Sequence, residues 1–281
     1  MSQRKWNASS DAYIKRPGVE PRATHKQQGS AQKSAQLDAC AITWSAEQLD
    51  FTVIKQGSVE RSRARFRASL PNLIWNAAAL EGNTFTLPEV QTLLEGVTVG
   101  GKPNRDAEQI LALSEGYAFI DEAVASHTFE LSKATSDQVH SRIAIHEAIE
   151  SGHFRGEGEV HGGGSVKLAN GGTVPGFPTG ERGELLINRH NRTLNSLEAL
   201  EDPRERALVY FASATRQQFY FDGNKRTARL MMSGELMKHG FDVVSVPYAR
   251  KFEFNQSLDH LFTTDDATPL MSFLISCAGV E

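Results

Sequence analysis

The stretch that decides the fold is Gln218-Phe219-Tyr220-Phe221-Asp222-Gly223-Asn224-Lys225-Arg226-Thr227-Ala228-Arg229. It follows a helical pattern over residues 203–216, and it opens a second helix that ends near Lys238-His239, with Gly240 as its C-terminal cap. The Asp-Gly-Asn turn is therefore predicted to lie between two helices, at the N-terminus of the second.

Such a helix start is suited to anions, because its first backbone N–H groups are unpaired and the positive end of the helix dipole lies there. Gly223 lets the chain adopt a conformation that other residues resist, and it lets a phosphate approach closely. Arg226 and Arg229 are three residues apart, so their guanidinium groups share one face and suit a polyphosphate. Asp222 offers the hard oxygen that Mg²⁺ prefers. Together these residues predict a site for ATP with Mg²⁺.

Asp-Gly-Asn alone is usually only a turn, and two arginines alone are usually a solvated face. The whole string is more specific, and it resembles the signature of the Fic (filamentation induced by cAMP, or Fido) family, His-x-Phe-x-Asp/Glu-Gly-Asn-Gly/Lys-Arg-x-x-Arg. Residues 222–226 and Arg229 match it, and Tyr220 is a conservative change from Phe. Upstream, residues 81–90, 100–102 and 106–108 also resemble the family, so the resemblance covers roughly residues 70–262.

The resemblance implies an all-α helical bundle with a small β-hairpin flap over the active site. It also implies transfer of AMP from ATP to a Ser, Thr or Tyr hydroxyl of a target protein. The residues predict the same flap independently: the Gly-rich stretch 152–180 encloses the alternating run Ser165–Leu168, and Asn170-Gly171 is a hairpin-turn signal. We expect the flap near residues 165–175, pinning a protein substrate by adding a strand to it.

Site roles follow from the resemblance where residues match. It assigns Asn224, with Gly223 and the loop amides, to the α-phosphate and Asp222 to Mg²⁺. Arg226 and Arg229 would hold the β- and γ-phosphates, with Lys225 in the same phosphate-binding turn. Asn255 and Phe254 fall where the family often places its adenine pocket, although core packing is the favoured interpretation of Phe254.

Gln218 departs from the family, which has its general-base histidine at this position. An amide has no usable basicity near neutral pH, and losing a general base typically removes about 10²–10⁴-fold of rate. Nothing in the spacing of His146 or His190 brings either to the site, and we interpret both as ordinary histidines. An engineered inactivating change, a natural nucleotide-binding pseudo-enzyme and altered chemistry all remain open as explanations of Gln218.

A second departure concerns control. Many relatives carry an inhibitory helix with the pattern Ser/Thr-x-x-x-Glu-Gly/Asn, whose Glu pairs with the second motif arginine and blocks the γ-phosphate. Here residues 70–83 keep Glu81 and Gly82 but have Ala77 at the Ser/Thr position. We therefore expect Glu81 to pair with Arg229 and to misplace the triphosphate.

Three functions are weighed: an adenylyltransferase, a nucleotide sensor or target-binding module without turnover, and a kinase. The kinase alternative rests on the run Asn-Lys-Arg-Thr-Ala, which resembles the Doc branch of the family. Gly223 and Arg229 favour AMP transfer over it.

The composition of the chain limits which partners and which cellular compartment we expect for it. The net charge of −4 gives no reason to expect nucleic acid or a membrane as partner, and two cysteines are too few for a disulfide framework or a structural zinc site. With no apolar leader, we expect a cytoplasmic protein, and the resemblance implies a homodimer.

We predict a disordered basic arm over 1–40, N-terminal helices over 41–130 and a core over 131–281. Further helices are predicted over 104–127, 135–151 and 181–200, with Asp137 and Asp202 as starts of two helices.

Overall fold

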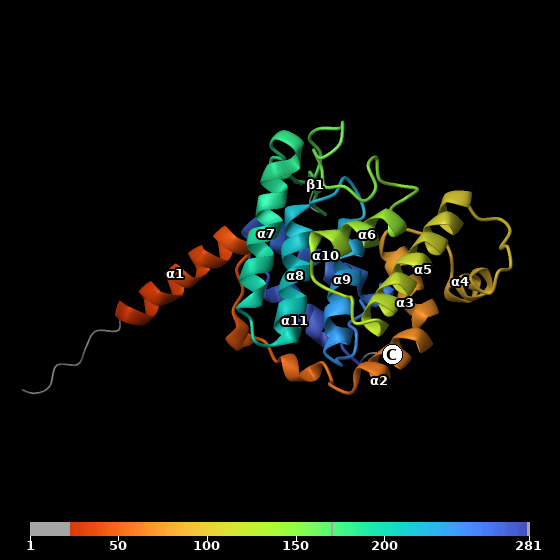
Figure 1. Ribbon diagram of the computed structural model, residues 1–281, viewed down its shortest axis with the longest axis horizontal. Helices are drawn as coiled ribbons and strands as arrows, with labels where there is room; N and C mark the ends of the chain where they lie inside the picture. The colour runs from red at the N-terminus through yellow and green to blue at the C-terminus, as the bar shows by residue number, and fades with distance from the viewer. Residues whose placement is uncertain (1–22, 170, 280–281) are drawn as a thin grey trace, which may run out of the picture.

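Two helices that pack against each other, α8 (Pro203–Gln217) and α9 (Asn224–Lys238), form the centre of the molecule (Figure 1). The computed structural model describes residues 23–169 and 171–279, with side chains from residue 32 onward. Asp202 caps the start of α8 by accepting from the backbone N–H of Arg204, and Pro203 takes the first turn, where no N–H is needed. Gly240, at φ +76°, follows α9 in the left-handed conformation that helix ends favour. These predicted boundaries are confirmed.

The remaining helices surround this pair. On one side α5 and α6 pack against α9, while α7 and α11 pack against α8. The helices are α1 (Ala23–Cys40), α2 (Val59–Ala68), α3 (Leu70–Leu80), α4 (Leu87–Leu94), α5 (Asn104–Ala125), α6 (Lys133–Ile143), α7 (Glu184–Glu198), α10 (Lys251–Thr264) and α11 (Thr268–Ser276). Short 3₁₀ turns lie at η1 (Ala46–Gln48), η2 (Phe51–Val53), η3 (Glu181–Gly183) and η4 (Tyr248–Arg250).

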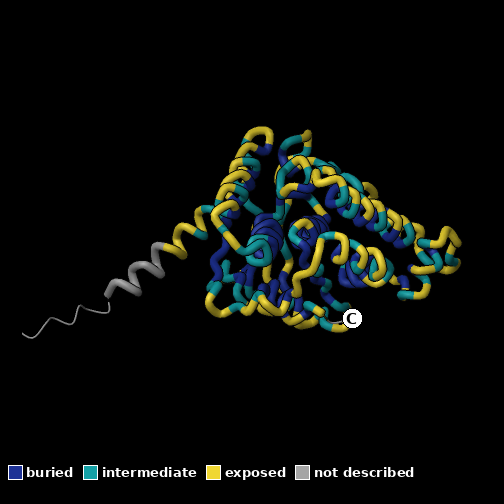
Figure 2. The backbone as a smooth tube through the Cα atoms, turned by 60° about the horizontal axis from the view of Figure 1, so that its bottom comes forward, coloured by how far each residue is buried: buried dark blue, intermediate teal, exposed yellow. Residues whose placement is uncertain are grey.

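The hydrophobic core runs without a break across residue 130, the boundary expected between the N-terminal helices and the rest. Ile74 of α3, Ile110 of α5 and Met231 of α9 are fully buried in one cluster. Figure 2 shows the buried backbone gathered in the middle of the molecule, with exposed residues on the outer turns. Residues 41–130 and 131–281 therefore share a core.

The predicted hairpin is present as β1 (Val166–Lys167) and β2 (Thr173–Val174). The strands are antiparallel, with Val166 opposite Val174 and Lys167 opposite Thr173. Within the described part of the chain the other elements are helical, so the all-α class with a small flap is confirmed. No helix there has both the length and the apolar character that crossing a membrane requires.

Two expectations about local structure are wrong. The helix expected over 135–151 is α6, which begins after Ser132, the residue whose side chain accepts from Thr135 N–H, and not at Asp137. It ends at Ile143 because the chain folds back onto its last turn: Ser151 Oγ donates to the carbonyl of His140, and Gly152 N–H donates to Nδ1 of the same residue.

The arm expected to be disordered over 1–40 instead forms helix α1 from Ala23. Its alanines, glutamines and lysines are good helix formers even without an apolar face, and its end packs against α7, where Cys40 is fully buried. The rest of that expectation, residues 1–22, lies outside the described residues.

Candidate functional site

The loop between α8 and α9 is held in one conformation by its own side chains. Gln218 ends α8 at φ +50°, a left-handed conformation that non-glycine residues adopt rarely. Asn224 Nδ2 donates to the carbonyl of Tyr220 (2.7 Å) and to Gln218 Oε1 (3.1 Å), while its Oδ1 accepts from Tyr220 N–H (2.8 Å). Gly223, at φ +70°, turns the chain into α9. The amide of Asn224 thus fixes the loop in addition to its predicted role.

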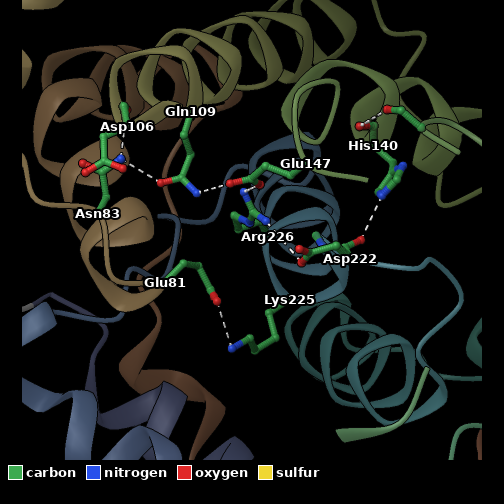
Figure 3. Close-up of polar contacts among 11 residues, drawn as sticks. Glu81, Asn83, Asp106, Gln109, His140, Glu147, Asp222, Lys225 and Arg226 are labelled. Atoms are coloured by element: carbon green, nitrogen blue, oxygen red, sulfur yellow. Dashed lines mark hydrogen bonds and ion pairs between the residues drawn. The ribbon is translucent and has the colours of Figure 1, made fainter. Parts of the chain in front are cut away.

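A histidine that the sequence did not single out supports this loop from α6. The ring of His140 stacks on Tyr220, with centroids 3.8 Å apart and planes 6° apart. Its Nδ1 accepts from Gly152 N–H, so Nε2 carries the proton and donates to the carbonyl of Asp222 (2.9 Å; Figure 3). Burial is the main cause that lowers the pKa of His140 to about 4. The imidazole is therefore neutral at physiological pH and acts as a fixed donor.

Tyr220 also anchors the loop through its hydroxyl. That group donates to Asp137 Oδ1 (2.8 Å) and lies 2.8 Å from Ser136 Oγ, both on α6. Burial raises the pKa of both Tyr220 and Asp137. Asp137 therefore stabilises the motif loop by accepting the hydrogen bond from Tyr220, although it does not begin a helix as predicted.

A cavity of about 530 Å³ opens over this loop. Three structures meet there: the motif, the flap and the side of α10. The predicted site residues that line it are Glu81, Gln218, Asp222, Gly223, Asn224, Lys225, Arg226 and Asn255. Arg229 is not among the lining residues. The structure thus brings together all but one of the residues singled out in the sequence, while their roles stay predictions.

Two of the three cations of the motif, Lys225 and Arg226, are already paired with carboxylates (Figure 3). Lys225 Nζ lies 3.1 Å from Glu81 Oε2. Arg226, which is 4% exposed, binds Glu147 through Nη1 and lies 3.4 Å from Asp222 Oδ1 through Nη2. A polyphosphate entering the cavity would therefore compete with these carboxylates for the same cations.

The expected pair of Glu81 with Arg229 is not formed. Glu81 caps the end of α3 beside Lys225 in the first turn of α9, whereas Arg229 lies a turn deeper, buried over the ring of Phe254. None of its guanidinium nitrogens has a hydrogen-bond partner among the described residues, and neither has Oε1 of Glu81. Burial raises the pKa of Glu81, but the charges of Lys225, Arg226 and Arg229 outweigh it, and the net direction is downward. Arg229 acts on Glu81 through its charge alone.

Asp222 fits the predicted magnesium role. Its side chain is 60% exposed and lines the cavity, while Oδ1 also accepts from Gly223 N–H. The described residues contain no cluster of three or more His, Cys, Asp or Glu that could hold a metal. This suits Mg²⁺ bound through one carboxylate, with the nucleotide phosphates and water supplying the other ligands.

Of the other residues considered in the sequence analysis, one lines the main cavity and the others lie outside it. Phe254 is buried between Phe211 and Phe273, as its core interpretation predicts, while Asn255 next to it lines the cavity. His190 lies in an aromatic cluster with Phe154, and burial lowers its pKa to about 3. His146 lines a separate cavity of about 360 Å³. Neither histidine lines the main cavity, so neither takes the place of a base at position 218.

Two further residues near the site escaped the sequence analysis. Glu147, the partner of Arg226, lies in the turns after α6, where a helix was predicted and no motif pointed to it. Arg155 donates to the carbonyl of Gln218. The only signal for it was the glycine cluster 162–164, because glycines gather where a backbone must approach another group closely.

Comparison with known proteins agrees with this site, although no family model matches the chain. It is 27% identical over 230 residues, 80% of its length, to a protein adenylyltransferase Fic of Drosophila erecta. It is 26% identical over 267 residues, 92% of its length, to the protein of that name from Nematostella vectensis. It spans 43% and 58% of those two relatives, about half their length.

Two solved structures share the fold. A Fic domain-containing signaling protein from Bacteroides thetaiotaomicron superposes with a TM-score of 0.63 at 22% identity, covering 90% of this chain and 91% of its own. Fic-1 (residues 134–508) from C. elegans gives 0.62 at 20% identity, covering 92% and 72%. The helical core, the flap and the motif loop define a Fic-type fold. The chain is thus similar to Fic (Fido) proteins both in sequence and in fold.

Proposed function

We propose that the cavity binds Mg·ATP and that the fold serves transfer of AMP to a protein hydroxyl, an activity impaired here by Gln218 and restrained by Glu81. The observation that supports this most directly is that motif residues 222–226, the flap and Glu81 line one cavity. The relatives named protein adenylyltransferase Fic support the same reaction and imply ATP as its substrate.

The reaction would join the acceptor oxygen to the α-phosphorus and break the bond to pyrophosphate. The α9 N-terminus and Arg226 would stabilise charge on the phosphates, and Asp222 would hold a Mg²⁺ ion, which would supply further positive charge there. A target segment would lie along β1 or β2, its hydroxyl directed toward position 218. Backbone bonds to the flap would place it with little dependence on sequence.

Gln218 cannot remove the acceptor proton in this arrangement. Its Nε2 donates to the carbonyl of Thr215 (2.7 Å), and its Oε1 accepts from Asn224. The proton must therefore go to water, and we expect about 10²–10⁴-fold slower transfer than with histidine at this position. The same contacts favour the second candidate, a module that binds nucleotide without turnover.

Glu81 would restrain the site from the end of α3. Its carboxylate forms an ion pair with Lys225 and interacts electrostatically with Arg226 and Arg229. A bound triphosphate would have to displace this carboxylate or be bent away from it. Among the described residues neither Oε1 of Glu81 nor the guanidinium of Arg229 has a hydrogen-bond partner, so Glu81 would break no hydrogen bond to Arg229 on moving aside for a triphosphate.

The test is labelled-phosphate transfer to the chain itself and to lysate proteins. We expect transfer from α-labelled ATP by Gln218→His, stronger transfer by Gln218→His with Glu81→Gly, and little by the chain as it stands. Calorimetry should show tighter Mg·ATP binding after Glu81→Gly alone, and equal affinity would refute the restraint. Transfer of γ-label instead would establish a kinase. Binding with no transfer by any variant would establish the nucleotide-binding module.

A further inference from the structure

A buried arginine outside the motif connects the flap to position 218. Arg155 is fully buried, and burial lowers its pKa. Its guanidinium donates to four backbone carbonyls: Nε to Gln218 (2.7 Å), Nη1 to Gly162 (2.8 Å) and Gly163 (2.9 Å), and Nη2 to Phe177 (3.2 Å). Every nitrogen of this charged group is therefore satisfied by main chain.

These four carbonyls belong to two different structures. Gly162 and Gly163 precede β1 and Phe177 follows β2, so they mark the two ends of the hairpin, whereas Gln218 begins the motif loop. The backbone N–H of Arg155 adds a bond to the carbonyl of Phe219 (2.8 Å). One residue thus joins both ends of the flap to the loop that carries the site.

The glycines around Arg155 leave it no room to move. A Cβ at Gly164 would lie 2.4 Å from the guanidinium carbon, and one at Gly176 would lie 2.6 Å from the carbonyl oxygen of Gly163. Both distances are far shorter than any real contact, so the two flap ends must close tightly around the guanidinium. The base of the flap is therefore closely packed around the guanidinium.

The far part of the flap is held separately. Ala169 N–H donates to Asp259 Oδ2 of α10 at 3.0 Å, on the opposite wall of the cavity. The hairpin is thus fixed at its base by Arg155 and near its turn by α10. Its height above position 218 is set mainly at the base, because among the described residues the hydrogen bonds between the flap and the motif loop run through Arg155 there.

We propose that Arg155 is the positioning residue that sets the flap relative to position 218, and so fixes where an acceptor hydroxyl lies against the nucleotide. This rests on the proposed function. An arginine suits the task because its planar fork of five donors reaches several carbonyls at once, which the single ammonium of a lysine cannot do. A misplacement of about 1 Å at a reacting centre costs on the order of 10²-fold in rate.

The first experiment is hydrogen exchange of the flap amides in Arg155→Lys. We expect exchange at residues 166–168 and 172–174 to become about tenfold faster or more, while α8 and α9 keep their protection. The matched control is Arg189→Lys, because Arg189 is a partly buried arginine that stacks on the ring of Phe177 (3.9 Å), its described contact with the flap. Unchanged exchange in Arg155→Lys would overturn the proposal.

A second variant approaches the same contact from the flap. Gly164→Ala would press a methyl group onto the guanidinium, whereas Gly162→Ala, at a similar positive φ, meets nothing within 4 Å. We expect faster flap exchange in Gly164→Ala than in Gly162→Ala. This comparison keeps the proposal testable if Arg155→Lys fails to fold, and equal exchange in the two glycine variants would contradict it.

The third measurement separates positioning from general stability. In the Gln218→His background, with α-labelled ATP and self-labelling as the readout, Arg155→Lys should keep the KM for ATP within about twofold while kcat falls about tenfold or more. A parallel loss in both would indicate a merely structural role and overturn the proposal. If Gln218→His transfers no label, the proposed function fails, and the exchange experiments alone decide whether Arg155 holds the flap.

Discussion

The charged residues of the site are arranged as competing pairs. Lys225 is bound to Glu81 and Arg226 to Glu147, while Arg229 has no hydrogen-bond partner among the described residues. An anion that entered the cavity would compete with Glu81 for Lys225 and with Glu147 for Arg226, whereas Arg229 does not line the cavity. If the site binds nucleotide as proposed, its affinity would therefore depend on these carboxylates as well as on the cations of the motif.

His140 makes the support of the motif loop sensitive to pH. Its pKa is lowered from 6.5 to about 4 by burial, so the unfolded chain binds a proton that the folded chain excludes. Stability from this residue is complete above about pH 6.5, falls as the pH drops below that value, and is fully lost below about pH 4. Between pH 7 and pH 5 we expect a loss of about 2 kcal/mol from His140.

The measurement is the free energy of unfolding by urea at pH 7 and pH 5, in the chain and in His140→Gln. The variant should show the smaller pH dependence, by about 2 kcal/mol. His190, whose pKa is lowered to about 3 by burial, provides the comparison, because it contributes in the same direction in both proteins. An equal pH dependence in the two proteins would show that His140 is charged in the fold or exposed to water.

At the scale of elements, the predictions succeeded where local chemistry decides. The start of α8 after Asp202, the end of α9 before Gly240 and the flap all depend on caps, turns and glycines that lie within a few residues of each other. The end of α6 at Ile143 failed because a tertiary contact decides it: the buried ring of His140 draws Gly152 back onto the helix.

In the candidate site, too, residues that belong to a local sequence pattern were predicted, and residues that act through tertiary contacts were not. The motif residues and Glu81 could be named from the sequence because they match one local pattern each. His140, Glu147 and Arg155 could not, because each acts through a contact with a segment more than 60 positions away. The predicted partner of Glu81, Arg229, was also wrong, because Glu81 pairs with Lys225. A sequence motif identifies the charged residues, but it does not show which turn of α9 faces the end of α3.

The crossing of α5 with α6 and α9 gives a prediction at this scale. A Cβ at Gly116 would lie 2.2 Å from Ile143 Cγ2 and 3.1 Å from Leu230 Cδ1, so the three helices approach too closely for any larger residue. Gly116→Ala should gain up to about 1 kcal/mol of helix propensity and lose about 1–3 kcal/mol to overpacking. We expect a net loss near 1–2 kcal/mol in urea unfolding. Glu115→Ala, exposed on the same helix, is the control and should change little.

A gain in stability from Gly116→Ala would mean that α6 can shift away without loss. That result would also question the rigidity of the motif loop, because α6 carries His140 and the residues that bind Tyr220.

At the scale of the whole molecule, the C-terminal end of helix α1 is fastened to α7 and α8 by a buried polar network. Ser213 Oγ donates to the carbonyl of Cys40 (2.7 Å), and Thr193 Oγ1 donates to that of Ala39 (3.1 Å). Gln217 Nε2 donates to both hydroxyls, at 2.9 Å and 3.0 Å. Helices α7 and α8 and the N-terminal segment therefore depend on one another, and α8 leads directly into the motif loop.

Gln217→Ala removes the centre of this network and leaves a buried gap beside it. Gln217 is 1% exposed, so water cannot easily replace its bonds, and we expect a loss of about 2–4 kcal/mol in the free energy of unfolding. Because the network joins the segments into one unit, the midpoints followed by tryptophan fluorescence, to which buried Trp44 contributes, and by far-ultraviolet circular dichroism should move together. Gln48→Ala, exposed in the same N-terminal part, should leave both unchanged. A fluorescence midpoint that falls while the dichroism midpoint stays would mean that the N-terminal segment detaches alone, and that the helices around the site fold without it.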